Sequence, residues 1–68
     1  MTVHLNGAPR EVEDRATVQA IVALLGMDAA TRGVAVAVDA RVVPRTAWPR
    51  TRVHPGAHVE VVTAMQGG

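Results

Sequence analysis

The fold is decided by the stretch Thr17–Gly26, TVQAIVALLG, within a chain of 68 residues. Four of its large apolar residues recur at the spacing of one helical face, namely Val18, Ile21, Val22 and Leu25. Thr17 is a residue type that caps helix N-termini, and Gly26 is one that ends helices in the left-handed conformation. A helix this short is not stable alone in water. The stretch therefore predicts a helix from about Thr17 to Leu25 whose apolar face packs on a sheet.

The residues before this helix predict a β-hairpin. Val3 and Leu5 alternate with polar neighbours, as in a strand with one apolar face. The dipeptide Asn6-Gly7 follows, and it favours a tight hairpin turn in which both central residues have a positive φ. We expect Pro9 to lengthen or distort this turn. The segment 10–13 should return as an edge strand, where proline and charged side chains discourage further pairing.

The residues after the helix predict further strands, beyond a loop over 27–33. Val34–Val38 is apolar on both parities, which is typical of a strand covered on both faces or facing small residues. The segment 41–43 should form a brief strand that ends at Pro44. The segment 45–51 should be a loop or a single helical turn. We expect Trp48 to pack this loop onto the edge of the sheet, with contact to a partner as the alternative.

The last strand is predicted over residues 57–63. Val59 and Val61 share one face of it, and Val62 falls on the opposite face. If Val59 and Val61 are buried, Val62 is exposed near the end of the strand. The predicted core consists of Val3, Leu5, Ile21, Leu25, Val36, Val59 and Val61.

These segments follow the order ββαβ(β)β around one helix. A sheet packed on one face by a helix is the two-layer α+β solution for such an order. First and last strands separated by a crossover should pair in parallel. We therefore predict an α+β, β-grasp (ubiquitin-like) fold, with a mixed four- to five-stranded sheet packed on one main helix. It should form one domain over residues 1–63, followed by a flexible C-terminal tail over 64–68.

Composition narrows the possible chemistry. The chain has no cysteine, so it has neither disulfides nor a side-chain thiol. Its seven arginines and six acidic residues give a net charge of +1. Nucleic-acid binding needs a clustered basic face, and a solvated or partner-docking face is the better interpretation of Arg41, Arg45, Arg50 and Arg52. No apolar run approaches the roughly 20 residues that span a bilayer, and no signal peptide is visible. We expect a soluble, cytoplasmic protein that binds neither nucleic acid nor membrane.

The polar side chains do not suggest a catalytic or metal site. His54 and His58 do not share a helical face, because the Pro55-Gly56 pair between them forbids a helix. No cysteine or nearby third ligand completes a metal site, and His4 should lie on the solvent face of its strand. An edge strand that runs into a helix start, where acids are favourable, explains the cluster Glu11, Glu13 and Asp14. We predict no catalytic residue and no bound metal.

The chain ends in Gly67-Gly68. A tail without side chains can pass through a narrow channel and adopt backbone conformations closed to other residues. The bare carboxylate of Gly68 can then be activated as an acyl adenylate and passed to a nucleophile. A frayed terminus is the alternative interpretation of the same two residues.

The sequence resembles the ThiS-type sulfur carriers of thiamine (thiazole) biosynthesis over nearly its whole length. The segments that carry the resemblance are Asn6-Gly7, Thr17-Val18, Val36-Ala37-Val38, Val42-Val43-Pro44-Arg45 with Trp48, Gly56, Val59-Glu60-Val61-Val62 and Gln66-Gly67-Gly68. The most specific part is the Val-Val-Pro-Arg-x-x-Trp stretch combined with a terminal Gly-Gly. Asp39-Ala40 departs from the family pattern, because relatives often carry Asn followed by a polar residue or glycine in this turn.

The resemblance implies a protein carrier rather than an enzyme. An E1-like adenylating enzyme would use Mg-ATP to adenylate the carboxylate of Gly68, and the chain itself would bind no cofactor. A cysteine desulfurase or another sulfur donor would convert the adenylate to a thiocarboxylate, which would donate sulfur to thiazole synthase. Partner docking would use Val62 and Ala64. The residues that thread into the partner active sites would be Met65, Gln66 and Gly67.

Two other roles fit the same features. The small subunit of molybdopterin synthase shares the fold and the Gly-Gly ending, although it tends to be longer between the helix and the final strand, and other sulfur-carrier roles are open. A non-covalent β-grasp binding module of the TGS type belongs to a different class. Such a module has no need of a Gly-Gly ending, so adding one C-terminal residue should inactivate a carrier and leave a binding module unaffected.

Overall fold

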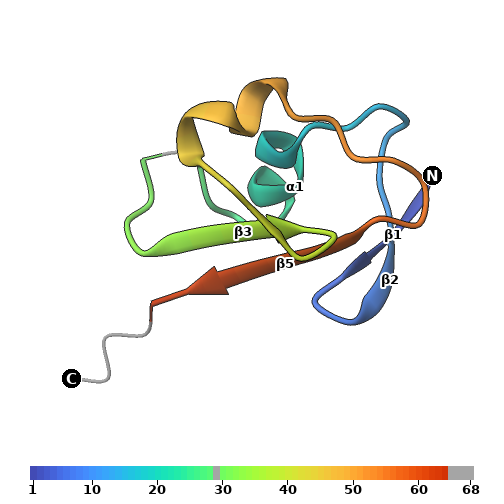
Figure 1. Ribbon diagram of the computed structural model, residues 1–68, viewed down its shortest axis with the longest axis horizontal. Coiled ribbons are helices and arrows are strands. Elements are labelled where there is room, and N and C mark those ends of the chain that lie inside the picture. Colours follow the sequence, from blue (N-terminus) through green and yellow to red (C-terminus); the bar gives the residue numbers. More distant parts are fainter. Residues whose placement is uncertain (29, 65–68) are drawn as a thin grey trace.

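Five strands and two helical segments make up the part of the chain that the computed structural model describes, residues 1–28 and 30–64 (Figure 1). In chain order they are β1 (Thr2–Leu5), β2 (Ala8–Glu11), α1 (Val18–Leu24), β3 (Val34–Val38), β4 (Arg41–Val43), the 3₁₀ helix η1 (Arg45–Arg50) and β5 (His58–Thr63). The segment after Pro44, predicted as a loop or a single helical turn, is the 3₁₀ helix η1.

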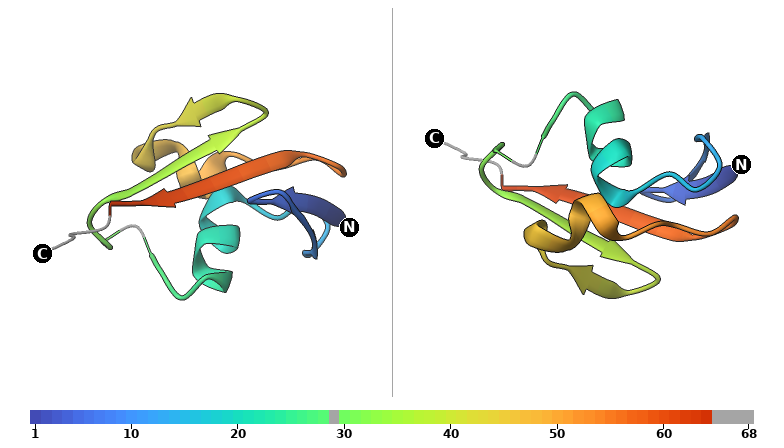
Figure 2. Two further views of the ribbon diagram at one scale, coloured as in Figure 1. Left: turned by 90° about the horizontal axis from the view of Figure 1, so that it is seen from below. Right: turned by 90° about the horizontal axis from the view of Figure 1, so that it is seen from above.

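The strands form one mixed sheet in the order β2-β1-β5-β3-β4. β1 pairs with β5 in parallel, whereas the other neighbouring strands are antiparallel. Both α1 and η1 lie over the same face of the sheet, and no helix or strand of the described residues covers the opposite face (Figures 1 and 2). The α+β, β-grasp fold and the parallel pairing of the first and last strands are confirmed.

The start of α1 is fixed by the predicted cap. Thr17 has an extended backbone, and its hydroxyl accepts a hydrogen bond from the backbone N–H of Ala20 at 3.1 Å. This bond satisfies one of the N–H groups that have no partner within the helix. The residues that α1 then buries against the sheet are Val18, Ile21 and Val22.

The end of α1 is set by Gly26, whose φ is +81°. The N–H of Gly26 donates to the C=O of Ala23 at 2.9 Å, and the N–H of Met27 donates to the C=O of Val22 at 3.2 Å. This pair of bonds is the Schellman motif. Leu25, predicted as the last helical residue and a core residue, is instead the C-cap and is only partly buried.

The hairpin of β1 and β2 turns at Asn6-Gly7, where φ is +51° and +84°, as the predicted turn requires. Leu5 pairs directly with Ala8, so Pro9 neither lengthens nor distorts the turn. The predicted edge strand is present, but its predicted bounds of 10–13 were wrong, because β2 spans Ala8–Glu11. Since the Leu5–Ala8 pair closes the turn with hydrogen bonds, the nitrogen of Pro9 faces away from β1 and no ladder bond is lost.

A second two-residue turn, Asp39-Ala40, joins β3 to β4 with φ of +49° and +67°. Neither residue is glycine, and the left-handed conformation costs a residue with a Cβ about 1–2 kcal/mol. The side chain of Asp39 holds the turn in place. Its Oδ1 accepts from the N–H of His58 at 3.0 Å, and its Oδ2 lies 2.7 Å from Nε2 of His54.

The core lies between α1, η1 and the inner face of the sheet, and all its described members are apolar. All the predicted core residues except Leu25 are buried. Trp48 is 1% exposed, and its Nε1 donates to the C=O of Val43 at 3.0 Å. It therefore packs within the fold, as expected. Besides Trp48, the buried residues that the predicted core did not include are Val12, Ala16, Val18, Val22, Val34, Val53 and Ala57.

β3 is covered on one face only. Val34 and Val36 are buried, whereas Ala35 between them is exposed. The interpretation of this strand as one covered on both faces was therefore wrong. Ala35 and Ala37 lie on the open face of the sheet, where their short side chains leave a shallow depression in the surface.

Candidate functional site

The candidate site begins where β5 ends. Ala64 follows the last strand residue, and its N–H donates to the C=O of Gly33 at 2.6 Å. This bond extends the β3–β5 ladder one step beyond the pair Val34–Thr63. Because β5 lies between β1 and β3, the tail begins at a central strand. The predicted site residues Met65, Gln66, Gly67 and Gly68 lie outside the described residues.

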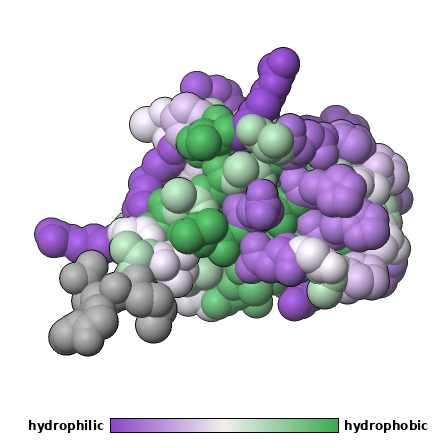
Figure 3. All heavy atoms as spheres, turned by 60° about the horizontal axis from the view of Figure 1, so that its bottom comes forward, coloured by the Kyte–Doolittle hydropathy of each residue, from purple (hydrophilic) through white to green (hydrophobic). Residues whose placement is uncertain are grey.

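Apolar side chains gather on the open face of the sheet (Figure 3). Val62 is 61% exposed and Val42 is 77% exposed. In the register of the sheet, Ala35 lies opposite Val62 and Ala37 lies opposite Val42, so the alanines of β3 form a low strip between the two valines. The sequence did not predict that Val42 belongs to this surface, because a strand of three residues shows no clear alternation. We define the outer patch as Ala35, Ala37, Val42, Val62 and Ala64.

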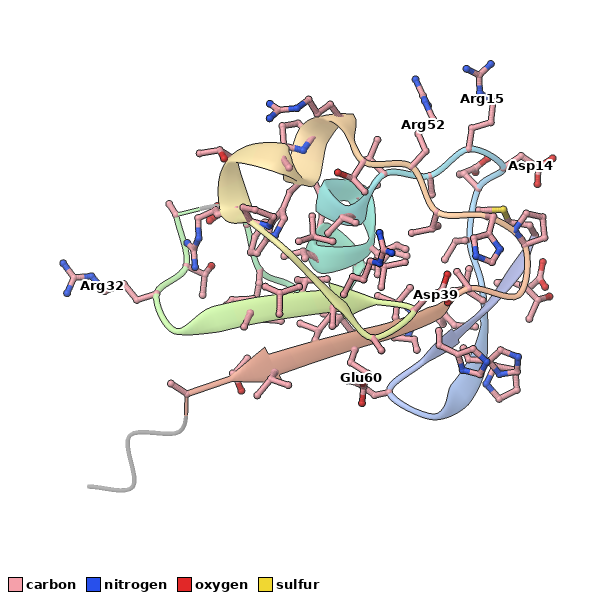
Figure 4. All side chains as sticks on the ribbon, viewed as in Figure 1. Asp14, Arg15, Arg32, Asp39, Arg52 and Glu60 are labelled. Carbon is pink, nitrogen blue, oxygen red and sulfur yellow. The ribbon has the colours of Figure 1, made fainter. Side chains whose placement is uncertain are left out.

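Charged residues border the outer patch. Glu60 lies opposite Ala37 in the register and points away from the helical layer (Figure 4). Arg32 projects into solvent from the loop before β3, at the end of the sheet where β5 stops (Figure 4). An exposed apolar surface with charges at its border is typical of a protein-binding site.

Two imidazole rings lie farther along the same face. His4 and His58 stack with their ring centres 4.6 Å apart and their planes inclined by 11°. They are directly paired across β1 and β5 and, with Asp39 and Glu60, line a hollow of about 470 Å³. Within residues 1–28 and 30–64, no group of three or more His, Cys, Asp or Glu side chains is placed to hold a metal ion.

Asp39 and His54 affect each other's ionisation. The N–H of His58 and then the ring of His54 stabilise the carboxylate, which lowers the pKa of Asp39 below its ordinary value of 3.8. The carboxylate of Asp39 and then the C=O of Pro55 raise the pKa of His54 above its ordinary 6.5. Both side chains are largely exposed. The pair therefore fastens the β3–β4 turn to the segment before β5.

Three of the four arginines that follow β3, namely Arg45, Arg50 and Arg52, donate hydrogen bonds to backbone carbonyls. Arg45 donates to the C=O of Thr31 at 2.7 Å and to the C=O of Val34 at 3.2 Å. Its guanidinium carbon lies 5.0 Å from the ring centre of Trp48. Backbone C=O groups also accept hydrogen bonds from Arg50 and Arg52.

The acidic cluster near the start of the chain does not serve the helix start, because the first turn of α1 contains no acid. Instead, the N-terminal ammonium of Met1 lies 3.1 Å from Oδ1 of Asp14 and 3.8 Å from Oε2 of Glu11. The hydrogen bond to Asp14 is the main cause that raises the pKa of this amino group. The explanation by the helix start was therefore wrong.

Fold and site together define a class. This is a β-grasp protein whose open sheet face carries an apolar patch beside the start of a C-terminal tail. Residues 3–68 match the model of the ThiS family, and the chain belongs to that family. Membership supports a role as a sulfur carrier in thiamine biosynthesis. No curated protein sequence matches the chain.

Two solved structures from Geobacter metallireducens are similar over the whole chain. The crystal structure of its thiamine biosynthesis protein ThiS is 30% identical, with a TM-score of 0.77, and all of both chains is covered. The solution structure of a thiamine biosynthesis protein from the same organism is 28% identical, also with a TM-score of 0.77, and 88% of that chain is covered. In the part of this chain that the structure describes, no helix is long and apolar enough to cross a membrane.

Proposed function

We propose that this chain carries sulfur as a thiocarboxylate on its C-terminal Gly68 and donates it to thiazole synthase. The observation that carries the proposal is the family match, which extends through the Gly-Gly ending to residue 68. The chain is a co-substrate of its partners in this proposal. The reacting group is its own carboxylate, and the catalytic side chains belong to the partner enzymes.

The chemistry follows from the weakness of a carboxylate as an electrophile. An E1-like adenylating enzyme uses Mg-ATP to join the Gly68 carboxylate to AMP, and pyrophosphate leaves. A sulfur donor, such as the persulfide of a cysteine desulfurase, attacks the activated carbonyl and displaces AMP. When the donor is a persulfide, a thiol must then cleave the S–S bond that joins donor and carrier. The product is a terminal thiocarboxylate, which is a good sulfur nucleophile at neutral pH.

The folded body supplies binding energy and position. We propose that the outer patch docks the adenylating enzyme, with Val62 and Ala64 nearest the tail. An extended chain advances about 3.3–3.6 Å per residue, so residues 65–68 reach about 13–14 Å beyond Ala64. The adenylation site of the partner must therefore lie within about 14 Å of the docked patch. Docking then makes the reaction of the tail effectively intramolecular.

The proposal is tested by the intact mass of the protein after incubation with an E1-like enzyme, Mg-ATP and a sulfur source. We expect the mass to rise by one exchange of oxygen for sulfur, located in the C-terminal peptide. Deletion of Gly68 withdraws the carboxylate by about 3.3–3.6 Å. Since even a 1 Å misplacement can cost about a hundredfold in rate, adenylation should collapse.

Two controls separate loss of chemistry from loss of fold. The Gly68 deletion should keep the melting temperature of the full chain, and a chain extended by one residue should be equally inactive because its carboxylate no longer belongs to Gly68. Normal thiocarboxylate formation on either altered chain would contradict the carrier mechanism. Continued binding of both chains to a partner, with no covalent product from the unaltered protein, would favour a non-covalent binding module.

A further inference from the structure

The first residue after β5 is packed against a glycine that has no room for a side chain. Gly33 has a φ of +71°, and a Cβ placed on it would lie 2.9 Å from the Cβ of Ala64. Facing side chains on neighbouring strands normally keep their Cβ atoms about 4.5–5.5 Å apart. The backbone of Gly33 therefore approaches the start of the tail more closely than any other residue type allows.

This close approach cannot be relaxed by a side-chain rotation. The contacting atom of Ala64 is its Cβ, which is fixed to the backbone, and the same two residues share the 2.6 Å hydrogen bond from Ala64 N–H to Gly33 C=O. A methyl group on Gly33 therefore requires the backbone of Gly33 or that of Ala64 to shift. The position of Gly33 thus determines the position from which the tail starts.

The segment that carries Gly33 is itself fastened from the helical layer. Arg45 donates to the carbonyls of Thr31 and Val34, which flank Gly33 on both sides. The guanidinium also lies over the ring of Trp48, a side chain that is 1% exposed. A planar guanidinium can serve two carbonyls and an aromatic face at once, which an ammonium group cannot do. Arg45 therefore ties the Gly33 segment to the core.

We propose that Gly33 is a positioning residue, held by Arg45, that sets where the C-terminal tail leaves the sheet and thereby aligns its carboxylate in the partner's active site. This proposal rests on the proposed function. It concerns mainly the alignment of the tail for adenylation, because Gly33 contacts only Ala64, the outer-patch residue at the start of the tail. It assigns a role in the reaction to two residues that lie far from Gly68 in the sequence.

The chain offers a matched control for the test. Gly56 has a φ of +79°, close to that of Gly33, but a Cβ placed on it meets no atom within 4 Å. Gly33→Ala and Gly56→Ala therefore impose the same kind of backbone strain. Only Gly33→Ala also displaces Ala64. A difference between the two variants reports the contact with the tail and not the cost of a positive φ.

The experiment measures kcat and KM of the E1-like adenylating enzyme with each carrier variant as substrate, together with melting temperatures. A displacement of about half an ångström should lower kcat for Gly33→Ala about tenfold, since 1 Å can cost about a hundredfold. KM for the carrier should change less than kcat does, because Gly33 contacts only Ala64 and the other four residues of the outer patch stay in place. Gly56→Ala should leave both constants unchanged. Equal kcat values for the two variants would overturn the proposal.

Two further variants keep the test decisive if Gly33→Ala is poorly folded. In the Ala64→Gly background the contacting Cβ is gone, and the nearest atom to the new methyl is then the Ala64 nitrogen at 3.5 Å. Gly33→Ala should therefore lose little further kcat on that background, as a double-mutant cycle measures. Arg45→Lys keeps the charge but should lower kcat more than it raises KM. A full loss from Gly33→Ala on both backgrounds would contradict the proposal, whereas failure of the unaltered protein to be adenylated would instead contradict the proposed function.

Discussion

The two faces of β5 have opposite environments although their residues alternate along one strand. Val59 and Val61 are 0% and 8% exposed and pack beneath α1, whereas Val62 is 61% exposed on the open face. The inner residues contribute to stability through burial. The outer ones add little to stability and are available to a partner. In this strand, the face on which a valine lies decides whether it stabilises the core or is exposed to a partner, although the side chain is the same.

The largest effect is expected on the inner side of this comparison. Ile21 is 0% exposed and faces the sheet from α1. Ile21→Ala should lower the free energy of unfolding by about 2–5 kcal/mol, because it removes buried methyl groups and leaves a cavity. Denaturant unfolding followed by circular dichroism measures this loss. The matched control is Leu24→Ala on the same helix, since Leu24 is 50% exposed and should cost far less.

An equal loss in the two helix variants would show that the helix face is assigned wrongly. Such a result would also contradict the distinction between buried and exposed faces, because burial against the sheet would then not determine stability. A chain of this size has only a small core, and a variant that fails to fold at all agrees with the prediction.

The next effect is expected on the outer side. Val62→Asp should leave the melting temperature nearly unchanged but lower kcat/KM of the adenylating enzyme for the carrier about tenfold, which corresponds to about 1.4 kcal/mol. The reason is that a carboxylate loses its hydration when the outer patch is covered. Steady-state kinetics with the carrier as the varied substrate measures this change. Unchanged kinetics would place the docking surface elsewhere.

A matched control for this variant is Leu24→Asp. It makes the same kind of change at an exposed apolar side chain, but on α1 rather than on the open sheet face. It should leave kcat/KM unaffected. A similar loss for both variants would mean that charge alone, and not the position of Val62, weakens the reaction.

A smaller effect is expected at the turn between β3 and β4. Ala40 has a φ of +67°, and Ala40→Gly removes about 1–2 kcal/mol of strain while it adds about 0.4–1 kcal/mol of unfolded-state entropy. The free energy of unfolding should therefore rise by about 0.5–1 kcal/mol, with no change in the kinetics of adenylation. Ala23→Gly within α1 is the control and should have the opposite sign. If Ala40→Gly lowers the free energy of unfolding, the claim that the positive φ of Ala40 is strained is wrong.

The smallest effect is a pH dependence of the Asp39–His54 pair. Because folding raises the pKa of His54, its contribution to the stability of the fold is complete below about pH 6.5, the pKa in the unfolded chain. This contribution is lost as the pH rises through the pKa of His54 in the folded protein. Because folding lowers the pKa of Asp39, its contribution to the stability of the fold is present above about pH 3.8, the pKa in the unfolded chain. This contribution is lost as the pH falls through the pKa of Asp39 in the folded protein. The pair thus stabilises most between these limits.

Melting temperatures of the unaltered protein and of His54→Gln at pH 5.5 and pH 8.5 measure this dependence. The difference between the two proteins should be larger at pH 5.5. His4 and His58 are present in both proteins, so the comparison isolates the change at position 54. A larger difference in melting temperature at pH 8.5 would contradict a stabilising contact between Asp39 and protonated His54.

Most of the fold could be predicted from the sequence because its signals are local. The Thr17 cap, the Gly26 terminus and the Asn6-Gly7 turn each act on a few neighbouring residues, and all three are present as predicted. Leu25 and Pro9 were misjudged for a related reason. Each lies at the boundary of an element, where a change of one residue decides between helix and cap or between turn and strand.

The features of the site that were missed depend on tertiary contacts. Gly33 contacts Ala64, and Arg45 contacts Thr31 and Val34, across segments that are remote in the sequence. The sequence alone does not show why a loop position is glycine, and an arginine after a strand is usually exposed to solvent. Only the packing of β3 beside β5 assigns these two residues to the start of the tail.

The central place of β5 also has a kinetic consequence. β5 joins β1 on one side to β3 on the other, although it comes last among the described strands. The two halves of the sheet therefore cannot associate until His58–Thr63 has been synthesised, and the parallel β1–β5 pair closes the longest loop in the fold. Such non-local pairing slows folding and leaves strand edges exposed during translation. The strand that leads into the C-terminal residues proposed to carry sulfur is thus also the one that completes the sheet.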